Sequence, residues 1–238
     1  MVIKVGISSE LEHFRAETYS TKEPETIEWL NWNLKDHDVF FDVGANIGLY
    51  SLYAAKFNPQ CTVYAFEPES QNFARLCTNI SINGLTNIIP CNFPLARRET
   101  FDFFYVGDMQ PGSALHSFGR MNELRLGAEN VPLRQGCLAV TLDALAGKYG
   151  LPQPALLKID VDGIENEILD GGEVVLRSNK LRTVLVELNL PHGGHPMGQE
   201  QRFASLGYKL QRMGSLYEMS GIRSQNYIFQ RIEAVDHS

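Results

Sequence analysis

Short apolar runs alternate with longer mixed stretches along most of this chain of 238 residues. The apolar runs have the length of β-strands, and most end in an acidic or polar residue. They predict strands at Val39–Val43, Thr62–Pro68, Asn87–Phe93, Ala155–Gly163 and Thr183–Asn189. The mixed stretches predict helices at Glu23–Leu34, Ile47–Phe57, Glu69–Gly84 and Ile164–Leu176. Strands that alternate with helices in this way are typical of a parallel sheet covered on both faces.

Two regions depart from this alternation. Between Pro94 and Leu138 only Phe101–Val106 has a strand pattern, so we expect an insert (94–138) that carries a lid or a substrate loop. After residue 198 the pattern predicts a helix and then two strands, Tyr208–Gly214 and Asn226–Ile232, joined by a short Gly/Ser link as an antiparallel hairpin. We predict one domain over residues 1–238, with residues 1–37 as an N-terminal strand and helix extension.

Composition narrows the class of protein. A net charge of −7 disfavours an extended nucleic-acid groove, which needs a basic surface. No apolar run approaches the roughly 20 residues of a membrane-spanning helix, and the N-terminus lacks the pattern of a signal peptide. The four cysteines are widely spaced, as expected of buried free thiols. We therefore expect a cytoplasmic globular protein.

The segment VFFDVGANIGLYS, Val39–Ser51, joins a strand to a helix through a glycine loop. Such a loop places backbone N–H groups beside a ligand, and glycine lets the ligand approach closely. The spacing from Gly44 to Gly48 lacks the middle glycine of a dinucleotide fingerprint. Asp42 would repel a pyrophosphate but suits a cationic amino group. The loop therefore favours S-adenosylmethionine over a dinucleotide, with an NAD(P)-dependent oxidoreductase as the alternative.

The next strand carries a second acid at its carboxyl end. Glu67 is followed by Pro68, which ends the strand. In proteins that bind either class of cofactor, an acid at this position accepts hydrogen bonds from the ribose hydroxyls. Asp42 alone is also explained as a turn acid and Glu67 alone as a surface acid. Because both acids lie at matching ends of adjacent predicted strands, we interpret Glu67 as the ribose ligand.

Further acids follow the later strands. Lys158 and Asp160 share one face of their strand, and Glu187 lies near the end of the strand after it. Asp160 is our first candidate for a general base or metal ligand, and the alternative is a structural acid paired with Lys158. Glu187 is a candidate on the acceptor side, and pairing with Lys158 explains it equally well. His192 lies in a glycine-rich loop that follows and is a further candidate base.

The signal for a metal is weak. Neither His192 nor His195 belongs to a zinc-binding spacing, and exposed loop histidines are the alternative. A set of Asp160, Glu187 and His192 would favour magnesium or manganese. We predict no metal ligand, although a divalent metal stays open.

The insert offers Ser113, His116 and Arg120. These residues would either close over the cofactor, hold a polar acceptor, or belong to an ordinary surface loop.

Four motifs in order give the chain a family resemblance. Residues 39–51, residues 63–84, LLKIDVDGIENEILDGG at residues 156–172 and VLVELN at residues 184–189 resemble the FkbM family of S-adenosylmethionine-dependent methyltransferases. The resemblance implies a class I methyltransferase (Rossmann-like) fold: a seven-stranded, mostly parallel sheet with an antiparallel last strand and helices on both faces. It also implies methyl transfer to a hydroxyl, often of a saccharide, glycolipid or natural product, with S-adenosylhomocysteine as product.

The resemblance assigns the cofactor-binding residues. Asp42, Gly44, Asn46 and Gly48 would surround the methionine end, and Glu67 would bind the ribose. Adenine contacts would come from Asn92, Phe93 and Ala96, in a segment that is more basic and proline-interrupted than the family pattern. A protein that binds the cofactor without turnover is a further alternative, disfavoured by the acids Asp160 and Glu187.

Overall fold

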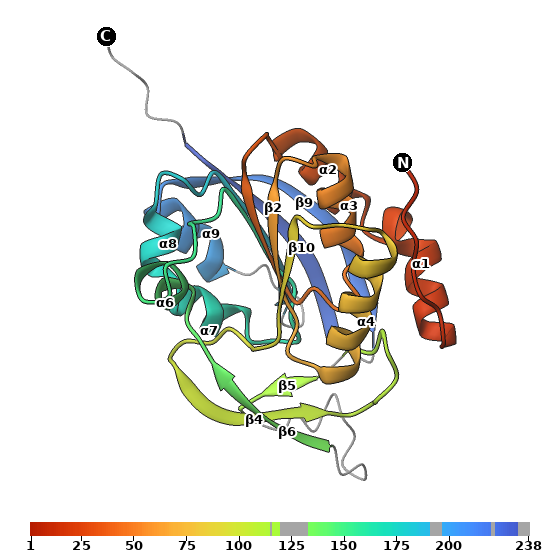
Figure 1. Cartoon of the computed structure of the whole chain (residues 1–238). Coiled ribbons are helices and arrows are strands. Elements are labelled where there is room, and N and C mark those ends of the chain that lie inside the picture. The colour runs from red at the N-terminus through yellow and green to blue at the C-terminus, as the bar shows by residue number, and fades with distance from the viewer. Residues whose placement is uncertain (115, 120–132, 191–196, 220–221, 233–238) are drawn as a thin grey trace.

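The computed structural model describes residues 1–114, 116–119, 133–190, 197–219 and 222–232. Seven strands form one sheet in the order β3-β2-β1-β7-β8-β10-β9 (Figure 1). Their bounds are β1 (Val39–Val43), β2 (Thr62–Phe66), β3 (Ile88–Cys91), β7 (Leu156–Ile159), β8 (Thr183–Leu190), β9 (Tyr208–Met219) and β10 (Ile222–Arg231). Strands β3, β2, β1, β7 and β8 are parallel, whereas β10 is antiparallel to β8 and to β9. The expected sheet, mostly parallel with a reversed last strand, is confirmed.

Both faces of the sheet are buried because its central strands are apolar at nearly every position. Phe40 packs into the cluster that contains Trp29, Leu52 and Leu76. Its neighbour Phe41 packs into the cluster on the opposite face. The helices are α2 (Pro24–Asn33), α3 (Leu49–Phe57), α4 (Ser70–Ile82), α6 (Leu142–Gly147), α7 (Glu165–Asp170), α8 (Glu173–Arg177) and α9 (Met197–Ser205). In Figure 1, α2, α3 and α4 lie on one side of the sheet and α6 to α9 on the other.

Two local features of the fold follow directly from residue chemistry. β3, which contains Pro90, is the edge strand next to β2, as expected for a residue without an N–H to donate. Gly84 ends α4 with a φ of +63°, the left-handed conformation that favours glycine.

The C-terminal hairpin is antiparallel as predicted, but its strands are longer. The predicted Gly/Ser link, residues 215–225, is mostly strand, since Leu216 pairs with Gln225 and Glu218 with Arg223. Alternating side chains let a strand continue through Gly214 and Ser215, so these residues were a misleading turn signal.

The insert forms a small second sheet. β4 (Thr100–Val106) was predicted, whereas β6 (Leu133–Ala139) and the two-residue β5 (Ser117–Phe118) were not. All three are antiparallel in the order β5-β4-β6. Figure 1 places this sheet below the main one, beyond the carboxyl end of β2.

The helix predicted at residues 164–176 is two helices, α7 and α8, which meet at Gly171–Gly172. A Cβ at Gly171 would lie 2.3 Å from the carbonyl oxygen of Ala96. The chain therefore turns where it packs against the backbone of the insert. Asp143 accepts the N–H groups of Val174 and Val175 at the start of α8.

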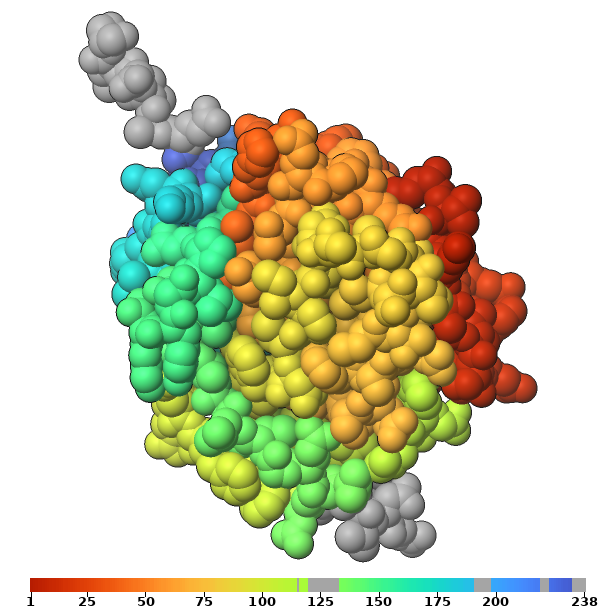
Figure 2. Space-filling model, in the orientation of Figure 1, coloured from red at the N-terminus to blue at the C-terminus, as the bar shows by residue number. Residues whose placement is uncertain are grey.

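The N-terminal residues pack along α4. All of residues 1–37 are described, and they hold α2 and an unpredicted helix, α1 (Glu10–Lys22), but no strand. Asn79 of α4 accepts the backbone N–H of Gly6, and Asn83, which caps that helix, accepts the N–H of Lys4. Figure 2 shows the N-terminal segment beside α4 on this face of the molecule.

Two expectations from composition can be compared with the fold. The helices within the described residues are too short or too polar to cross a membrane. All four cysteines are free thiols; Cys61 and Cys137 are buried, and Cys77 and Cys91 are partly buried.

Candidate active site

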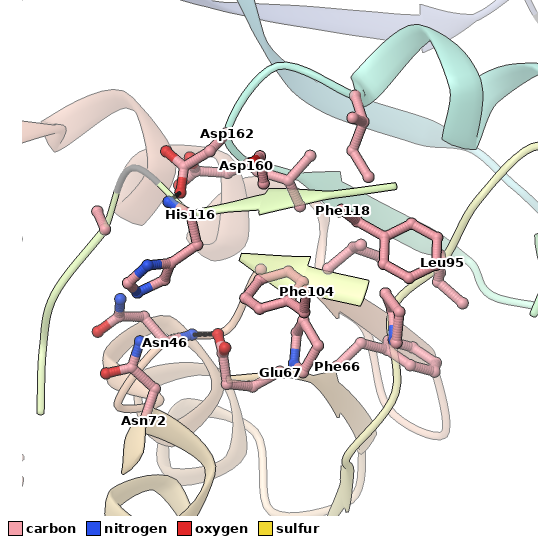
Figure 3. Close-up of a pocket in the computed structure, with 18 of the residues that line it drawn as sticks. Asn46, Phe66, Glu67, Asn72, Leu95, Phe104, His116, Phe118, Asp160 and Asp162 are labelled. Carbon is pink, nitrogen blue, oxygen red and sulfur yellow. Dashed lines mark hydrogen bonds between the residues drawn. The ribbon is translucent and has the colours of Figure 1, made fainter. Parts of the chain in front are cut away.

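Two adjoining cavities lie where the parallel strands end. The larger has a volume of about 720 Å³ and is bounded by α1, the glycine loop, the ends of β7 and β8, and the C-terminal hairpin. The smaller, of about 110 Å³, lies between the ends of β1 and β2, the segment after β3, and the insert (Figure 3). Gly44, Asn46 and Asp160 line both cavities. A ligand could therefore extend from one into the other.

The glycines of the β1–α3 loop are needed for packing inside the protein. Gly44 has a φ of +83°, and a Cβ there would lie 1.9 Å from the carbonyl oxygen of Asp160. Gly48 has a φ of +89°, and its Cβ would lie 2.4 Å from Leu76. Gly48 lines neither cavity. We had expected glycine to admit the ligand, but these neighbours already occupy the space that a side chain would take.

Asn46 positions Glu67. The backbone N–H of Asn46, a non-glycine residue with a φ of +51°, donates to Glu67 Oε2 over 2.8 Å, and the N–H of Glu69 donates to Oε1 over 2.8 Å. Burial raises the pKa of Glu67 to about 8 against the lowering effect of these two hydrogen bonds. Each carboxylate oxygen keeps a second lone pair, and Glu67 lines the smaller cavity.

Asp42 lies behind the cavities. Its side chain is 1% exposed and lines neither cavity. It accepts a hydrogen bond from Ser51 over 2.6 Å and lies 3.7 Å from Lys158 Nζ. Burial raises the pKa of Asp42 against the lowering effect of Lys158. Asp42 would therefore act on a ligand only through Lys158. Because its side chain lines neither cavity, it is not placed to contact the methionine end of the cofactor directly.

Lys158 and Asp160 form the ion pair that the sequence left as an alternative. Lys158 Nζ donates to Asp160 Oδ2 over 2.7 Å and lies 5.2 Å from the centre of the Tyr50 ring. Burial lowers the pKa of Lys158, but Asp160 and Asp42 outweigh it and raise the pKa above its usual value. Burial raises the pKa of Asp160, but Lys158 outweighs it and lowers the pKa. Both groups therefore stay charged near neutral pH.

Glu187 follows Val186, which pairs with Ile159, so it lies on the strand next to Asp160. It has no cationic partner among the described residues. Its Oε1 accepts a hydrogen bond from Ser224 over 3.0 Å, so the pairing with Lys158 considered from the sequence is not formed. Burial first, and then the charges of Asp160 and Glu23, raise its pKa well above the usual value. Glu187 therefore holds a proton to higher pH than an ordinary glutamate.

The apolar part of the smaller cavity suits an aromatic ring system. Phe66, Phe93 and Leu95 line one side, and Phe104 and Phe118 of the insert line the other. Of the three residues proposed from the resemblance, Phe93 lines this cavity, and the other two lie elsewhere. The Asn92 amide donates to the carbonyl oxygens of Glu67 and Pro68, and Ala96 is buried in the insert's own cluster. Their neighbours in the same segment face the cavity instead.

Sequence reasoning missed the contribution of α1 and of the hairpin. Arg15, Tyr19 and Glu23 line the larger cavity from the N-terminal helices, and Tyr217 lines it from β9. Glu23 is 4% exposed and accepts a hydrogen bond from Tyr50 over 3.1 Å. No local motif marks these residues, because distant segments bring them to the cavity.

Several candidates cannot be compared with the structure. His192, His195 and Arg120 lie outside the described residues. Within the described residues, no group of three or more His, Cys, Asp or Glu side chains could hold a metal ion. A metal set that includes His192 therefore stays untested.

The donor set fits S-adenosylmethionine. Glu67 offers acceptor lone pairs for ribose hydroxyls, the aromatic walls suit adenine, and the buried Nδ1 of His116 has no partner among the described residues. The acids of the larger cavity suit the cofactor's cationic end. None of these groups needs a pyrophosphate as its partner.

The sequence comparisons agree with this fit. Residues 42–214 match the methyltransferase FkbM domain family. The hexuronic acid methyltransferase AglP of Haloferax volcanii is 28% identical over 168 residues, covering 70% of this chain and 62% of AglP. The 31-O-demethyl-FK506 methyltransferase FkbM of Streptomyces tacrolimicus is 32% identical over 163 residues, covering 59% and 61%. The matched region spans about three fifths of the curated relatives.

A solved structure shares the fold. Methyltransferase FkbM from Methylobacillus flagellatus KT superposes with a TM-score of 0.52 at 12% identity, covering 93% of this chain and 56% of that chain.

Proposed function

The chain belongs to the FkbM family of S-adenosylmethionine-dependent methyltransferases, and we propose that it transfers a methyl group to a hydroxyl oxygen of a small molecule, such as a saccharide, glycolipid or natural product. One observation carries the proposal: a narrow cavity with a buried ribose-type acid, Glu67, opens into a wide polar cavity at Asp160. The first cavity has the chemistry of a cofactor site. The second has the volume of a small-molecule site.

The cofactor roles follow from contacts. Glu67 binds the ribose, Asn46 orients Glu67, and Phe93 and Leu95 contact the adenine. Gly44 keeps the loop against the end of β7. Lys158, which Asp42 contacts from behind, keeps Asp160 ionised. The bound cofactor supplies an electrophilic methyl group on a sulfonium.

Asp160 takes the acceptor's proton in this proposal. A neutral hydroxyl is a poor nucleophile, and a positioned base contributes about 10²–10⁴-fold. The low pKa of Asp160, set by Lys158 against burial, keeps it ionised. A weak base suffices because the hydroxyl becomes strongly acidic as the new C–O bond forms. Glu187, with its raised pKa, then holds the acceptor from the end of the neighbouring strand.

The charges of the larger cavity favour an acceptor without negative charge. Six carboxylates and three cationic side chains line it within the described residues. Lys158 is paired with Asp160, and Lys22 with Glu23. A neutral or cationic hydroxyl compound therefore meets less repulsion than a carboxylate-bearing one.

Two other functions stay as alternatives. An NAD(P)-dependent oxidoreductase would place a pyrophosphate at the glycine loop, near the acids Asp160 and Asp162. A binding protein without turnover would need no Asp160–Lys158 pair at the junction of two cavities.

Calorimetry on the purified protein tests the cofactor. We expect S-adenosylmethionine and S-adenosylhomocysteine to bind and NAD not to bind. Glu67→Ala should weaken binding at least about tenfold, because it removes the hydrogen bonds to both ribose hydroxyls, each worth roughly 0.5–1.5 kcal/mol. Glu173→Ala, an exposed glutamate on α8, is the matched control and should leave affinity unchanged. Binding of NAD alone would overturn the proposal.

A further inference from the structure

His116 lies in the wall that the insert contributes to the smaller cavity. The residue precedes β5, is 4% exposed and packs against Phe104 with the ring centres 5.8 Å apart. Its backbone N–H donates to Asp162 over 2.9 Å. Figure 3 shows its ring on the side of the cavity where Asn46 and Glu67 lie. The side chain is therefore fixed at the cavity, although the proposed cofactor roles leave it unused.

The hydrogen bonds around His116 define its tautomer. Ser113 Oγ donates its proton to the carbonyl oxygen of Asp108 over 2.8 Å. The 3.0 Å contact between Ser113 Oγ and His116 Nε2 therefore has Nε2–H as the donor. Burial lowers the pKa of His116, so the ring is neutral and Nδ1 carries a lone pair.

That lone pair is left without a partner. His116 Nδ1 is buried and accepts no hydrogen bond from any residue that the structure describes. Ser117 Oγ, in the same wall of the cavity, is also buried and unpaired. Buried polar groups are normally paired, so an unpaired acceptor in a cavity wall is available to a bound ligand. The ligand must present a hydrogen-bond donor to Nδ1.

The neighbouring contacts indicate which donor. Asn46 links the two walls, because its backbone N–H binds Glu67 Oε2 and its side-chain amide binds the carbonyl oxygen of Ser113. Ser113 in turn holds His116. His116 and Glu67 are thus tied through one residue at the polar end of the cavity, away from the ring-binding side formed by Phe93 and Leu95. Hydroxyl groups are the donors expected there.

We propose that His116 Nδ1 accepts a hydrogen bond from a ribose hydroxyl of the cofactor, so that the insert and Glu67 hold the ribose from two sides. This inference rests on the proposed function. It assigns the insert a part in cofactor binding that the β1 and β2 motifs do not contain.

Calorimetric binding of S-adenosylhomocysteine to paired variants tests it. His116→Gln keeps a group that reaches Ser113 but has no acceptor at the Nδ1 position, and should bind about fivefold to tenfold more weakly. His116→Asn places an amide oxygen near the Nδ1 position and should bind within about twofold of the unaltered protein. His13→Gln, at an exposed position of α1, is the matched control and should change nothing.

A second test changes the ligand instead of the protein. The 2′,3′-dideoxy analogue of S-adenosylhomocysteine should bind the unaltered protein and His116→Gln equally, because the hydroxyl that distinguishes them is gone. Equal weakening with both ligands, or unchanged binding in His116→Gln, would overturn this proposal alone. Failure of the unaltered protein to bind S-adenosylhomocysteine would overturn the proposed function as well.

Discussion

At the scale of single residues, Asp160 has a charge that its neighbours determine. Lys158 donates to it directly, and Asp42 holds Lys158 from the other side. The side chain of Asp160 is 28% exposed, whereas those of Lys158 and Asp42 are 1% exposed. The site therefore presents the Asp160 carboxylate to the cavity and buries the lysine that keeps it ionised.

Asp160→Asn removes that carboxylate while keeping its shape. We expect methyl transfer to fall about 10²–10⁴-fold, the usual contribution of a positioned base, with S-adenosylhomocysteine affinity within a few-fold of the unaltered protein. Single-turnover transfer from labelled cofactor and calorimetry measure the two quantities. Asp36→Asn, an exposed turn residue, is the control. Undiminished transfer in Asp160→Asn would exclude Asp160 as the base.

Glu67 is a carboxyl whose burial has a consequence for stability. Burial raises its pKa from 4.5 to about 8, so the folded protein keeps a proton that the unfolded chain releases. Its contribution to the free energy of unfolding is full below pH 4.5 and is lost as the pH rises through about 8. This single proton gives a slope of up to about 1.4 kcal/mol per pH unit.

We therefore expect denaturant unfolding of the ligand-free protein to show stability falling between those two pH values. Glu67→Gln should flatten this pH dependence, since an amide does not titrate in this range. The difference between the two proteins isolates Glu67 from other titrating groups. Parallel pH profiles would show that Glu67 is ionised in the folded protein throughout.

At the scale of elements, α1 is held by polar contacts. Ser9 and Glu12 form a capping box at its start, and Glu12, fully buried, pairs with Arg75 of α4. Arg15 donates to the carbonyl oxygen of Gly112 in the insert. Leu11 and Arg15 line the larger cavity. The helix therefore connects α4, the insert and the acceptor side of the site.

Glu12→Ala should weaken these connections. It leaves Arg75 without its partner and opens the capping box, so we expect the free energy of unfolding to fall by about 3 kcal/mol. Glu17→Ala, which removes an exposed glutamate of the same helix, should cost less than about 1 kcal/mol. Denaturant unfolding compares the two. Equal effects would mean that the buried pair adds nothing beyond helix propensity.

At the scale of the whole molecule, the strands of the main sheet were predictable because they are apolar on both faces. β1, β2 and β8 stand out as runs of Val, Leu and Phe. β6 did not, because its sequence LRQGCLA mixes charge and glycine, and its pairing to β4 is set by tertiary contact. α1 was missed because ELEHFRAETYSTK has no apolar stripe, and its stability comes from α4 and the insert.

Some residues of the site could be predicted from the sequence and others could not. Glu67 and Asp160 follow strands whose ends must meet at one edge of a parallel sheet, so their positions followed from the pattern. The structural reason for a glycine at position 44 could not be predicted from the pattern, because the atom that excludes a side chain there is the carbonyl oxygen of Asp160. His116 was one of three candidates in the insert, and only the contacts of Ser113 distinguish it.

The charge of the larger cavity makes a prediction about the acceptor as a whole. Its wall carries more carboxylates than cations within the described residues, and Glu187 is the carboxyl whose raised pKa makes its charge depend on pH. For matched pairs of a neutral glycoside and its uronic acid, we expect kcat/KM to be at least about tenfold lower for the uronic acid, or about 1.4 kcal/mol.

This discrimination should increase as the pH rises and Glu187 ionises, since the added negative charge repels only the charged member of each pair. Glu187→Gln should remove the pH dependence while leaving part of the discrimination, which Asp160 and Glu23 still supply. The measurement is initial-rate methylation of both members at several pH values. Preference for the uronic acid would mean that a cation of the wall, such as Arg15 or Lys22, binds its carboxylate, and the neutral-acceptor assignment would then be wrong.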